Sequence, residues 1–420
     1  MRRFFFLFLF FLFYLNSLAV NKYDTRILAP HINSLQIIAE NDTFGDPVIH
    51  MGSEDRLTIG FDVMSHRPHY YVYRIVHCEA DWTKSENISE LDYLKGFSEN
   101  KIEESYVSLN TTFEYTHYYF SIPNENVELQ LSGNYAIEVV DAENTDSVVA
   151  TACFYVTEDI VSIEGNISTN TPYGVKNSYQ MLDFSVDYSS LQVSDYTQQI
   201  KTVVVQNGRT DNKVFNVPPS FCQNEKLIFK NERKLVFEGG AEFDRIDFSH
   251  RKNFSGQIDR IFFARPYYHV DLIPKEEPLK KDYQFDFDVD GRYKFHAQDV
   301  WSDREIDYSI VHFTYKREEP WIDGSLYFAG YFNDNRLDSL NKMVYSYERT
   351  HYEIVTTLKN GGYNYQYLFL PSGSTVATTL RTTGSHWETG NTYTVYVYYK
   401  PLGGQTDRLV GIENILSRNK

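Results

Sequence analysis

The amino-acid sequence predicts an all-β protein built from tandem immunoglobulin-like β-sandwiches. Apolar and polar residues alternate with period two along much of the chain, as they do in strands with one buried face. Turn-forming residues separate these segments at short intervals, a spacing typical of sandwiches. Tyr (34 residues) and Phe (30 residues) supply apolar surface for the cores, which excludes an intrinsically disordered chain.

The strands expected from this alternation are rich in β-branched and aromatic side chains, which suit a pleated, half-buried surface. The clearest are residues 71–76, 135–140, 153–156, 201–206 and 393–399. Turns are expected between strands at Gly133, Asn207-Gly208, Gly239-Gly240, Asp290-Gly291 and Gly361-Gly362. Stretches with helical periodicity are scarce, and the best of them, residues 88–93, is predicted to form one or two helical turns.

The chain of 420 residues is predicted to divide into successive segments. Residues 1–19 are a signal peptide, residues 20–158 an N-terminal sandwich and residues 159–315 a middle sandwich. A charged stretch ending in proline opens the C-terminal sandwich, residues 316–406, and a charged tail follows at residues 407–420. We find no repeat of fixed period in the sequence, so a solenoid or a propeller is not expected.

The N-terminal segment has the three parts of a secretory signal. Arg2 and Arg3 form the basic region, residues 4–15 are an unbroken apolar run, and small residues precede a cleavage site after Ala19. The apolar run is short for a bilayer span, although an uncleaved anchor is the alternative. Because no Cys follows Ala19 directly, a lipid anchor is not expected, and the mature chain is predicted to be exported.

The net charge of −17 excludes partners that are bound through positive charge. Nucleic acids and anionic lipid surfaces both attract Lys and Arg, so neither is an expected partner. The cysteines, Cys78, Cys153 and Cys222, are too few for a disulfide-stapled scaffold. Cys78 and Cys153 can pair if their strands adjoin; otherwise both are separate thiols, so the disulfide state stays open.

The sequence lacks the common catalytic motifs, with neither a Gly-x-Ser-x-Gly elbow nor a phosphate-binding loop. His66, His69, His77 and Glu79 are close in sequence, but their spacing does not define a tetrahedral zinc site. Residues 286–291 begin like a calcium loop but lack the Glu at its last position, so a strand with one acidic face is expected there instead. No catalytic residue, metal or cofactor is therefore predicted, and the chain is not expected to be an enzyme.

Trp82 and Trp301 each lie near the end of a predicted strand. An exposed Trp can anchor a partner, whereas a buried one covers the core. Both interpretations stay open for Trp82, and Trp301 is predicted to cover the core.

Long motifs in a fixed order give the chain a resemblance to a known family. They occupy residues 73–82, 90–97, 110–112, 115–118, 122–127, 131–135, 205–212 and 238–247. Together they resemble the plug-protein family of the Bacteroidota type IX secretion system, over nearly all of the mature chain. The resemblance implies a periplasmic, multi-domain β protein that is peripheral to the outer membrane. It also implies a non-enzymatic plug, which binds the periplasmic opening of the outer-membrane translocon and closes the empty pore.

The resemblance makes the translocon barrel protein the expected partner. Aromatic residues in loops are the best candidates for its contacts, and Trp82, Tyr93 and Phe97 are predicted to make them. The loops that contact the barrel, the trigger for release and the oligomeric state stay open.

The C-terminal sandwich has a second resemblance. Residues 358–367 are similar to the strand–turn–strand of glycogen-binding, early-set immunoglobulin-like modules. Those modules stack a Trp on glucose, and here Phe332 is the nearest aromatic residue. An exported carbohydrate-binding β-sandwich protein is therefore the alternative function, and an exported glycosidase or an adhesion module are further alternatives.

Overall fold

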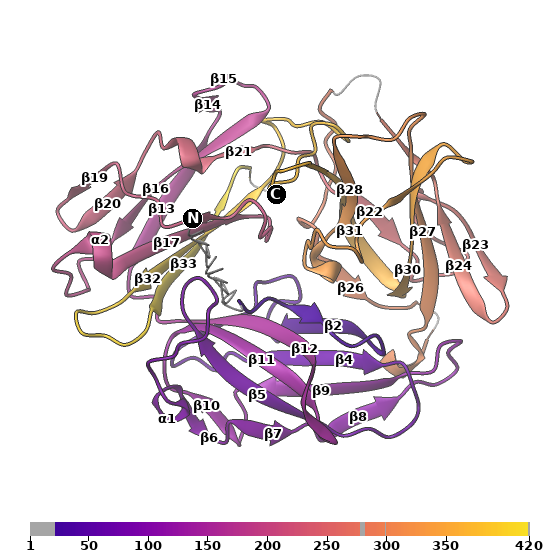
Figure 1. Cartoon of the computed structure of the whole chain (residues 1–420), viewed down its shortest axis with the longest axis horizontal. Coiled ribbons are helices and arrows are strands. Elements are labelled where there is room, and N and C mark those ends of the chain that lie inside the picture. The colour runs from indigo at the N-terminus through magenta and orange to yellow at the C-terminus, as the bar shows by residue number, and fades with distance from the viewer. Residues whose placement is uncertain (1–21, 278–281, 299, 419–420) are drawn as a thin grey trace, which may run out of the picture.

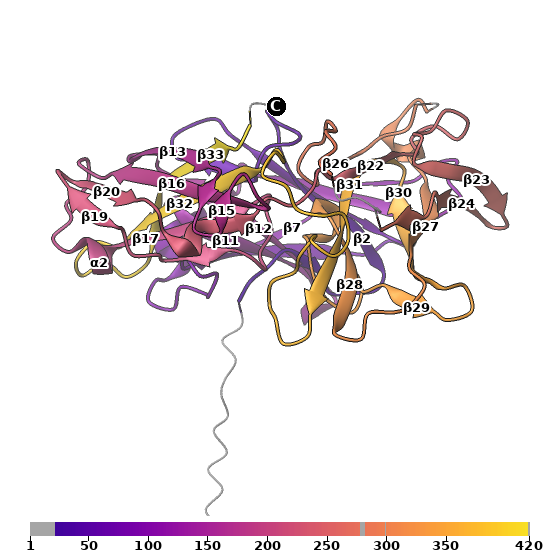
Figure 2. The same cartoon turned by 90° about the horizontal axis from the view of Figure 1, so that it is seen from above.

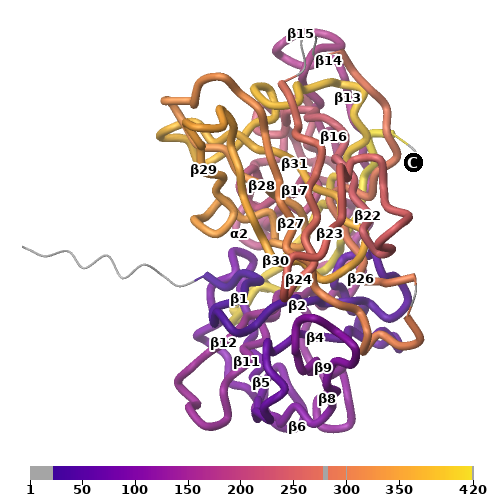
Figure 3. Tube along the Cα trace, turned by 90° about the vertical axis from the view of Figure 1, so that its right-hand side faces the viewer, coloured from indigo at the N-terminus to yellow at the C-terminus, as the bar shows by residue number. Residues whose placement is uncertain are grey.

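The computed structural model describes residues 22–277, 282–298 and 300–418. It is almost entirely β, with 49% strand and 4% helix, which confirms the predicted fold class. The strands form three sandwich-like lobes arranged as a flattened triangle (Figure 1, Figure 2). Seen from the side, the second and third lobes both rest on the first (Figure 3). The predicted signal peptide, residues 1–19, lies outside the described residues.

The first sandwich, the lower lobe in Figure 1, packs two mainly antiparallel sheets around one core. One sheet contains, in spatial order, β1 (Arg26–Ile27), β12 (Asn144–Thr157), β11 (Gly133–Asp141), β5 (Tyr71–Cys78) and β7 (Glu99–Lys101), with β3 (Val48–His50) beside β12. The other contains β2 (Ile32–Ala39), β4 (Leu57–Val63), β9 (Thr116–Ile122) and β8 (Glu104–Val107). The helix α1 (Glu90–Tyr93) and the paired strands β6 (Leu94–Gly96) and β10 (Val127–Leu129) complete this lobe.

The strands predicted at residues 71–76, 135–140 and 153–156 are confirmed as β5, β11 and β12. Their apolar side chains pack against β4 and β9 in a core that includes the buried rings of Phe61, Tyr71, Tyr135 and Phe154. The predicted helical turns are confirmed as α1, where the Asp92 carboxylate accepts a hydrogen bond from the Ser89 N–H at 2.7 Å and so caps the helix.

The second sandwich, the left lobe in Figure 1, is assembled from two distant parts of the chain. One sheet contains β13 (Ser162–Ser168), β16 (Tyr179–Asp187), β20 (Lys226–Phe229) and β19 (Phe221–Gln223), with β21 (Val236–Glu238) beside β16. The other contains β18 (Val214–Phe215), β17 (Ile200–Gln206), β32 (Thr392–Tyr399) and β33 (Arg408–Leu416). Smaller elements are β14 (Asn170–Thr171), β15 (Gly174–Val175), α2 (Tyr196–Gln199) and the 3₁₀ turn η1 (Arg233–Leu235).

The pairing of β17 with β32 divides the chain differently from the predicted domains. The predicted strands at 201–206 and 393–399 are confirmed, but they lie side by side, with Ile200 opposite Tyr399. The middle sandwich therefore includes residues expected in the C-terminal one, and the third sandwich is inserted into the second. The prediction of a separate tail at 407–420 is wrong, because β33 pairs with β32 and places Val410 in the core of the second sandwich.

The third sandwich, the right lobe in Figure 1, contains the inserted residues. One sheet contains β22 (Asp244–Asp247), β31 (Gly361–Pro371) and β26 (Tyr293–Phe295), with β28 (Gly324–Ala329) beside β31. The other contains β23 (Ile258–Ala264), β24 (Tyr267–Leu272), β27 (Tyr308–Lys316), β30 (His351–Lys359) and β29 (Val344–Ser346), with β25 (Lys275–Glu276) beside β27. The 3₁₀ turns η2 (Asp303–Glu305) and η3 (Tyr331–Asn333) complete this lobe.

Two of the predicted turns have the backbone that a tight hairpin requires. Asn207 and Gly208 both have positive φ, at 49° and 65°, and Asp290 and Gly291 do so at 50° and 84°. The acidic stretch before Asp290 is not a strand, so that prediction is wrong. Its extended backbone is held by side-chain contacts instead, such as the Asp288 carboxylate that accepts from the Phe243 N–H at 2.6 Å.

The cysteines are free, and the topology explains why Cys78 and Cys153 stay apart. Cys78 lies on β5 and Cys153 on β12, and both strands pair with β11 from opposite sides. A whole strand therefore separates the two thiols, so they cannot form a disulfide in this fold. Within the described ranges, no helix has the length and hydropathy that a bilayer crossing requires.

Candidate functional site at the junction of the three sandwiches

A cavity of about 450 Å³ lies where the three sandwiches meet. Each sandwich contributes to its wall, with Trp82 and Tyr155 from the first, Val205 and Tyr396 from the second, and Arg292 and Tyr331 from the third. The contacts around this junction decide whether the lobes move separately or as one body.

A buried ionic cluster joins the first sandwich to the third. The Asp62 carboxylate on β4 is fully buried and accepts hydrogen bonds from Lys359 Nζ at 2.7 Å, His117 Nδ1 at 2.6 Å and the Tyr308 hydroxyl at 2.5 Å. Burial alone raises the pKa of Asp62, but Lys359 and His117 outweigh it and hold the pKa below its ordinary value. Lys359 Nζ also lies 4.2 Å from the centre of the Tyr115 ring. The Asp62 carboxylate therefore stays ionised although it is buried between the first and third sandwiches.

A second contact extends the same interface. The buried Asp307 carboxylate accepts from both the backbone N–H of Thr112, at 2.9 Å, and its hydroxyl, at 2.9 Å. The Tyr115 hydroxyl donates to the Ile306 carbonyl at 2.8 Å. Phe113 stacks on Tyr267 with ring centres 3.9 Å apart. The loop between β8 and β9 is thus clamped onto the third sandwich.

The first and second sandwiches meet around Asp407, which precedes β33. Its buried carboxylate accepts from Lys201 Nζ at 2.8 Å and from the Ala80 N–H at 3.2 Å. In the same interface, the Tyr398 hydroxyl on β32 donates to Asn134 Oδ1 on β11 at 2.7 Å. The residues expected to form a charged tail therefore make this interface.

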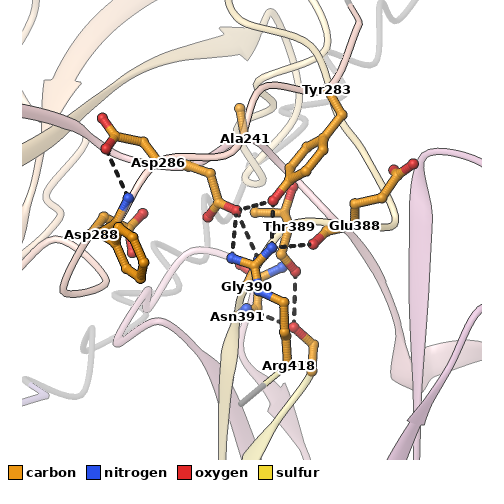
Figure 4. Close-up of polar contacts among 12 residues, drawn as sticks. Ala241, Tyr283, Asp286, Asp288, Glu388, Thr389, Gly390, Asn391 and Arg418 are labelled. Carbon is orange, nitrogen blue, oxygen red and sulfur yellow. Dashed lines mark hydrogen bonds and ion pairs between the residues drawn. The ribbon is translucent and has the colours of Figure 1, made fainter. Parts of the chain in front are cut away.

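The second and third sandwiches are joined by the two chain crossings and by buried polar groups. The Thr392 hydroxyl on β32 of the second sandwich donates to the Asp290 carboxylate of the third at 2.7 Å. The Glu242 carboxylate accepts from the Tyr283 hydroxyl at 2.6 Å and from Arg418 at 3.1 Å. Figure 4 shows Tyr283 and Arg418 meeting beside Gly390. Since every pair of lobes shares buried hydrogen bonds, the three sandwiches form one body.

His77 lies buried against the Asp407 interface. In the neutral imidazole, Nε2–H donates to the Ser132 carbonyl at 3.1 Å, and Nδ1 accepts from the Ser85 hydroxyl at 2.9 Å. Burial lowers the pKa of His77 to about 4, against the smaller raising effects of Ser132 and Asp407. Protonation therefore favours the unfolded chain, in which this histidine has its ordinary pKa.

We expect stability to fall as the pH drops from about 6.5 to about 4, by roughly 3 kcal/mol from His77 alone. The contribution of neutral His77 to the free energy of unfolding is complete above the ordinary histidine pKa. It is lost as the pH falls towards the lowered pKa of His77 in the folded protein. Urea unfolding near neutral and near acidic pH measures it in the wild type and in His77→Gln. The variant should be less stable near neutrality but lose less stability on acidification, and an equal loss in both proteins would contradict the assignment.

The aromatic contacts predicted from the sequence do not form one surface. Trp82 is half-buried in the wall of the junction cavity. Tyr93 is 5% exposed, and its hydroxyl donates to the Ile75 carbonyl at 3.1 Å, so it belongs to the core and cannot anchor a partner in this conformation. Phe97 is 68% exposed and follows directly after β6, a strand on the side of the first sandwich that faces away from the other two lobes (Figure 1).

Other sequence-based interpretations also change with the structure. Trp301 is 98% exposed, so the prediction that it covers the core is wrong. Phe332, the expected sugar platform, packs in the third core with its ring centre 5.1 Å from that of Phe328. In the described part of the chain, no three His, Cys, Asp or Glu side chains gather as metal ligands. The site at the junction is therefore a cavity lined by charged groups and aromatic rings.

Sequence reasoning missed Asp62 and Lys359, although a signal was present. Asp62 is the one charged residue of the mostly apolar strand β4, and Lys359 ends β30 shortly before Gly361 and Gly362. A lone charge in a buried strand requires a partner of opposite charge. The sequence gives no indication of which partner this is.

Comparisons with known proteins place the chain among its relatives. Residues 32–158 match the family model described as the type 9 secretion system plug protein 1st domain. A crystal structure of a hypothetical protein from Parabacteroides merdae is 36% identical and has a TM-score of 0.91, with 94% of this chain and 100% of that chain covered. A search of curated proteins gave no match. The matched family is not an enzyme family. The chain therefore belongs to the type 9 secretion system plug protein family.

Proposed function

We propose that the protein is a non-enzymatic periplasmic plug, which binds the periplasmic opening of the outer-membrane translocon and closes the empty pore. The observation that carries the proposal is the match of residues 32–158 to the first domain of the plug family. Family membership relates the chain to type 9 secretion, to a component of that system and to the cell envelope. The barrel partner, the closure of the pore and the cleavage after Ala19 are parts of the proposal.

The structure supports this function through rigidity. A plug must resist deformation, and here each pair of sandwiches is joined by buried polar contacts, including Asp62 with Lys359 and the Asp407 carboxylate with the Ala80 N–H. Breaking such a contact leaves an uncompensated buried charge, so bending between the lobes is costly. The flattened triangle offers a broad face to a pore mouth (Figure 1).

A plug must also dissociate from the translocon, so that a substrate can pass through the pore. A polar interface of standard size suits reversible binding better than a large apolar one. The net charge of −17 would steer the protein towards a basic rim and make the association rate depend on salt.

Two exposed aromatic residues are the proposed contacts with the translocon. Phe97 keeps the role predicted from the sequence, because its ring is open to solvent. Trp301 is a stronger candidate, since an exposed Trp is a frequent anchor of interfaces. It lies near the seam between two sandwiches, where Arg304 Nε donates to the Val107 carbonyl at 3.1 Å and the backbone beneath is held in place.

We expect a tagged wild-type protein, recovered from the envelope of an exporting cell, to bring down a very large outer-membrane barrel protein. Trp301→Ala and Phe97→Ala should each weaken the recovery about tenfold if they are anchors, because an interface anchor contributes more than 1 kcal/mol. Ile322→Ala, which truncates a side chain that is 96% exposed on another loop, is the matched control and should leave recovery unchanged. Repeated absence of any barrel protein from the wild-type sample would sink the proposal.

A further inference from the structure

The charged side chains of the junction cavity are paired, with two exceptions. Lys22 pairs with Asp81 at 2.9 Å, Arg292 with Asp46 at 2.5 Å, and Arg336 with Asp24. The Asp334 carboxylate and the Lys213 ammonium line the same cavity, and neither has an ion-pair partner within 4.0 Å among residues 22–277, 282–298 and 300–418. The cavity thus presents one free acid and one free base.

The two free groups come from different sandwiches. Asp334 follows η3 in the third sandwich, and Lys213 precedes β18 in the second. The pKa of Asp334 is raised to about 8, chiefly by burial, with Arg336 lowering it and Asp24 raising it by smaller amounts. Lys213 is an exposed residue at the rim of the cavity, and partial burial of its ammonium lowers its pKa, while Asp81 and Asp24 raise it. Both residues line the same cavity, so a ligand bound there would contact the second and third sandwiches together.

A free hydrogen-bond donor lies next to the free acid. Asn335 is 3% exposed, lines the cavity, and its Nδ2 has no acceptor among the described residues. A buried N–H without an acceptor is costly, so the site favours a ligand that brings a carbonyl oxygen. Asp334 and Asn335 both have positive φ, at 54° and 51°, a strained backbone that is common at ligand sites.

Aromatic rings form the apolar part of the wall. Trp82 meets Tyr155 edge-on with ring centres 5.2 Å apart, and Tyr155 stacks on Tyr396 at 4.6 Å. Trp82 itself has a φ of 72°, rare for a bulky residue. The volume of about 450 Å³ is in the range of small-ligand pockets, which combine apolar walls with a few convergent polar groups.

We propose that the junction cavity binds a short peptide with free ends. The peptide ammonium pairs with Asp334, its carboxylate with Lys213, a backbone carbonyl accepts from Asn335 Nδ2, and a side chain packs on the rings of Trp82 and Tyr396. A zwitterion of this kind brings an opposite charge to each of the two side chains, which favours the ionised form of Asp334, and supplies an acceptor for the unpaired amide. This binding site goes beyond the plug function and does not depend on it.

Titration calorimetry of the full chain with the unblocked tripeptide Ala-Tyr-Ala tests the proposal. We expect binding near neutral pH, and a loss of about tenfold or more when the amino end is acetylated or the carboxyl end is amidated. Asp334→Asn and Lys213→Gln should each cause a similar loss. Asn tolerates the positive φ at position 334, so the turn is kept. Glu348→Gln and Lys230→Gln, on exposed parts of the third and second sandwiches, are the matched controls and should bind like the wild type.

The blocked peptides keep the test decisive even if a variant fails to fold, because they are used with the wild-type chain. Absence of binding at millimolar tripeptide would overturn the proposal. Equal binding of blocked and unblocked peptides would also overturn it, since the free ends would then have no role. Neither result bears on recovery of the barrel partner, so failure here is distinguishable from failure of the plug function.

Discussion

Lys359→Met should destabilise the protein by about 3–5 kcal/mol, because it leaves the Asp62 carboxylate buried without its cation. Methionine has a similar length, so packing around Tyr115 is largely kept. The remaining donors, His117 and Tyr308, do not replace the ammonium at 2.7 Å. Urea unfolding, followed through the aromatic residues of the first and third sandwiches, measures the loss.

The controls for this experiment separate a buried charge from an exposed one. Arg349→Met removes an ion pair with Glu353 at the surface and should cost less than about 1 kcal/mol. The double variant Asp62→Asn with Lys359→Met no longer buries a lone charge, so it should be more stable than the sum of its two single variants predicts. Additive losses would show that the two residues do not act as a pair.

Gly208→Val should cost about 2–5 kcal/mol through two effects at one position. The φ of 65° is unfavourable for a β-branched residue, and a Cβ atom built there lies 2.1 Å from the Tyr331 hydroxyl oxygen. The new side chain must therefore displace a ring that packs between the second and third sandwiches. Thermal unfolding measures the cost, and small-angle scattering should show a larger radius if the two lobes separate.

Gly403→Val is the matched control for the clash. Gly403 has a φ of 78°, but a Cβ atom there would find nothing within 4 Å. Its substitution carries the backbone strain alone, about 1–2 kcal/mol, and should leave the scattering radius unchanged. If both variants lose the same stability, the contact with Tyr331 does not matter.

The sequence predicts the strands better than it predicts which strands pair. The alternation at 71–76, 135–140 and 393–399 is a local signal, and these strands appear where expected. The pairing of β17 with β32 is not local, because a pleated strand carries no mark of its partner. The domain boundaries therefore could not be predicted from the sequence, because they depend on this pairing.

Exposure of single aromatic residues was equally difficult to predict. Tyr93 and Trp301 both lie in polar stretches of sequence, yet Tyr93 is buried at the end of α1 and Trp301 is open to solvent. The difference depends on long-range packing, which places Tyr93 in the core of the first sandwich. The free pair of Asp334 and Lys213 comes from two lobes, so no sequence motif could have joined them.

The insertion of one sandwich into another sets an order for folding. The strands β32 and β33 are synthesised after the whole third sandwich, so β17 has an unpaired edge until they arrive. A prematurely terminated chain would expose that edge and the apolar face behind it, which makes it prone to aggregation and proteolysis. Only a chain long enough to return to its starting lobe escapes this fate, and the topology thereby works as quality control on length.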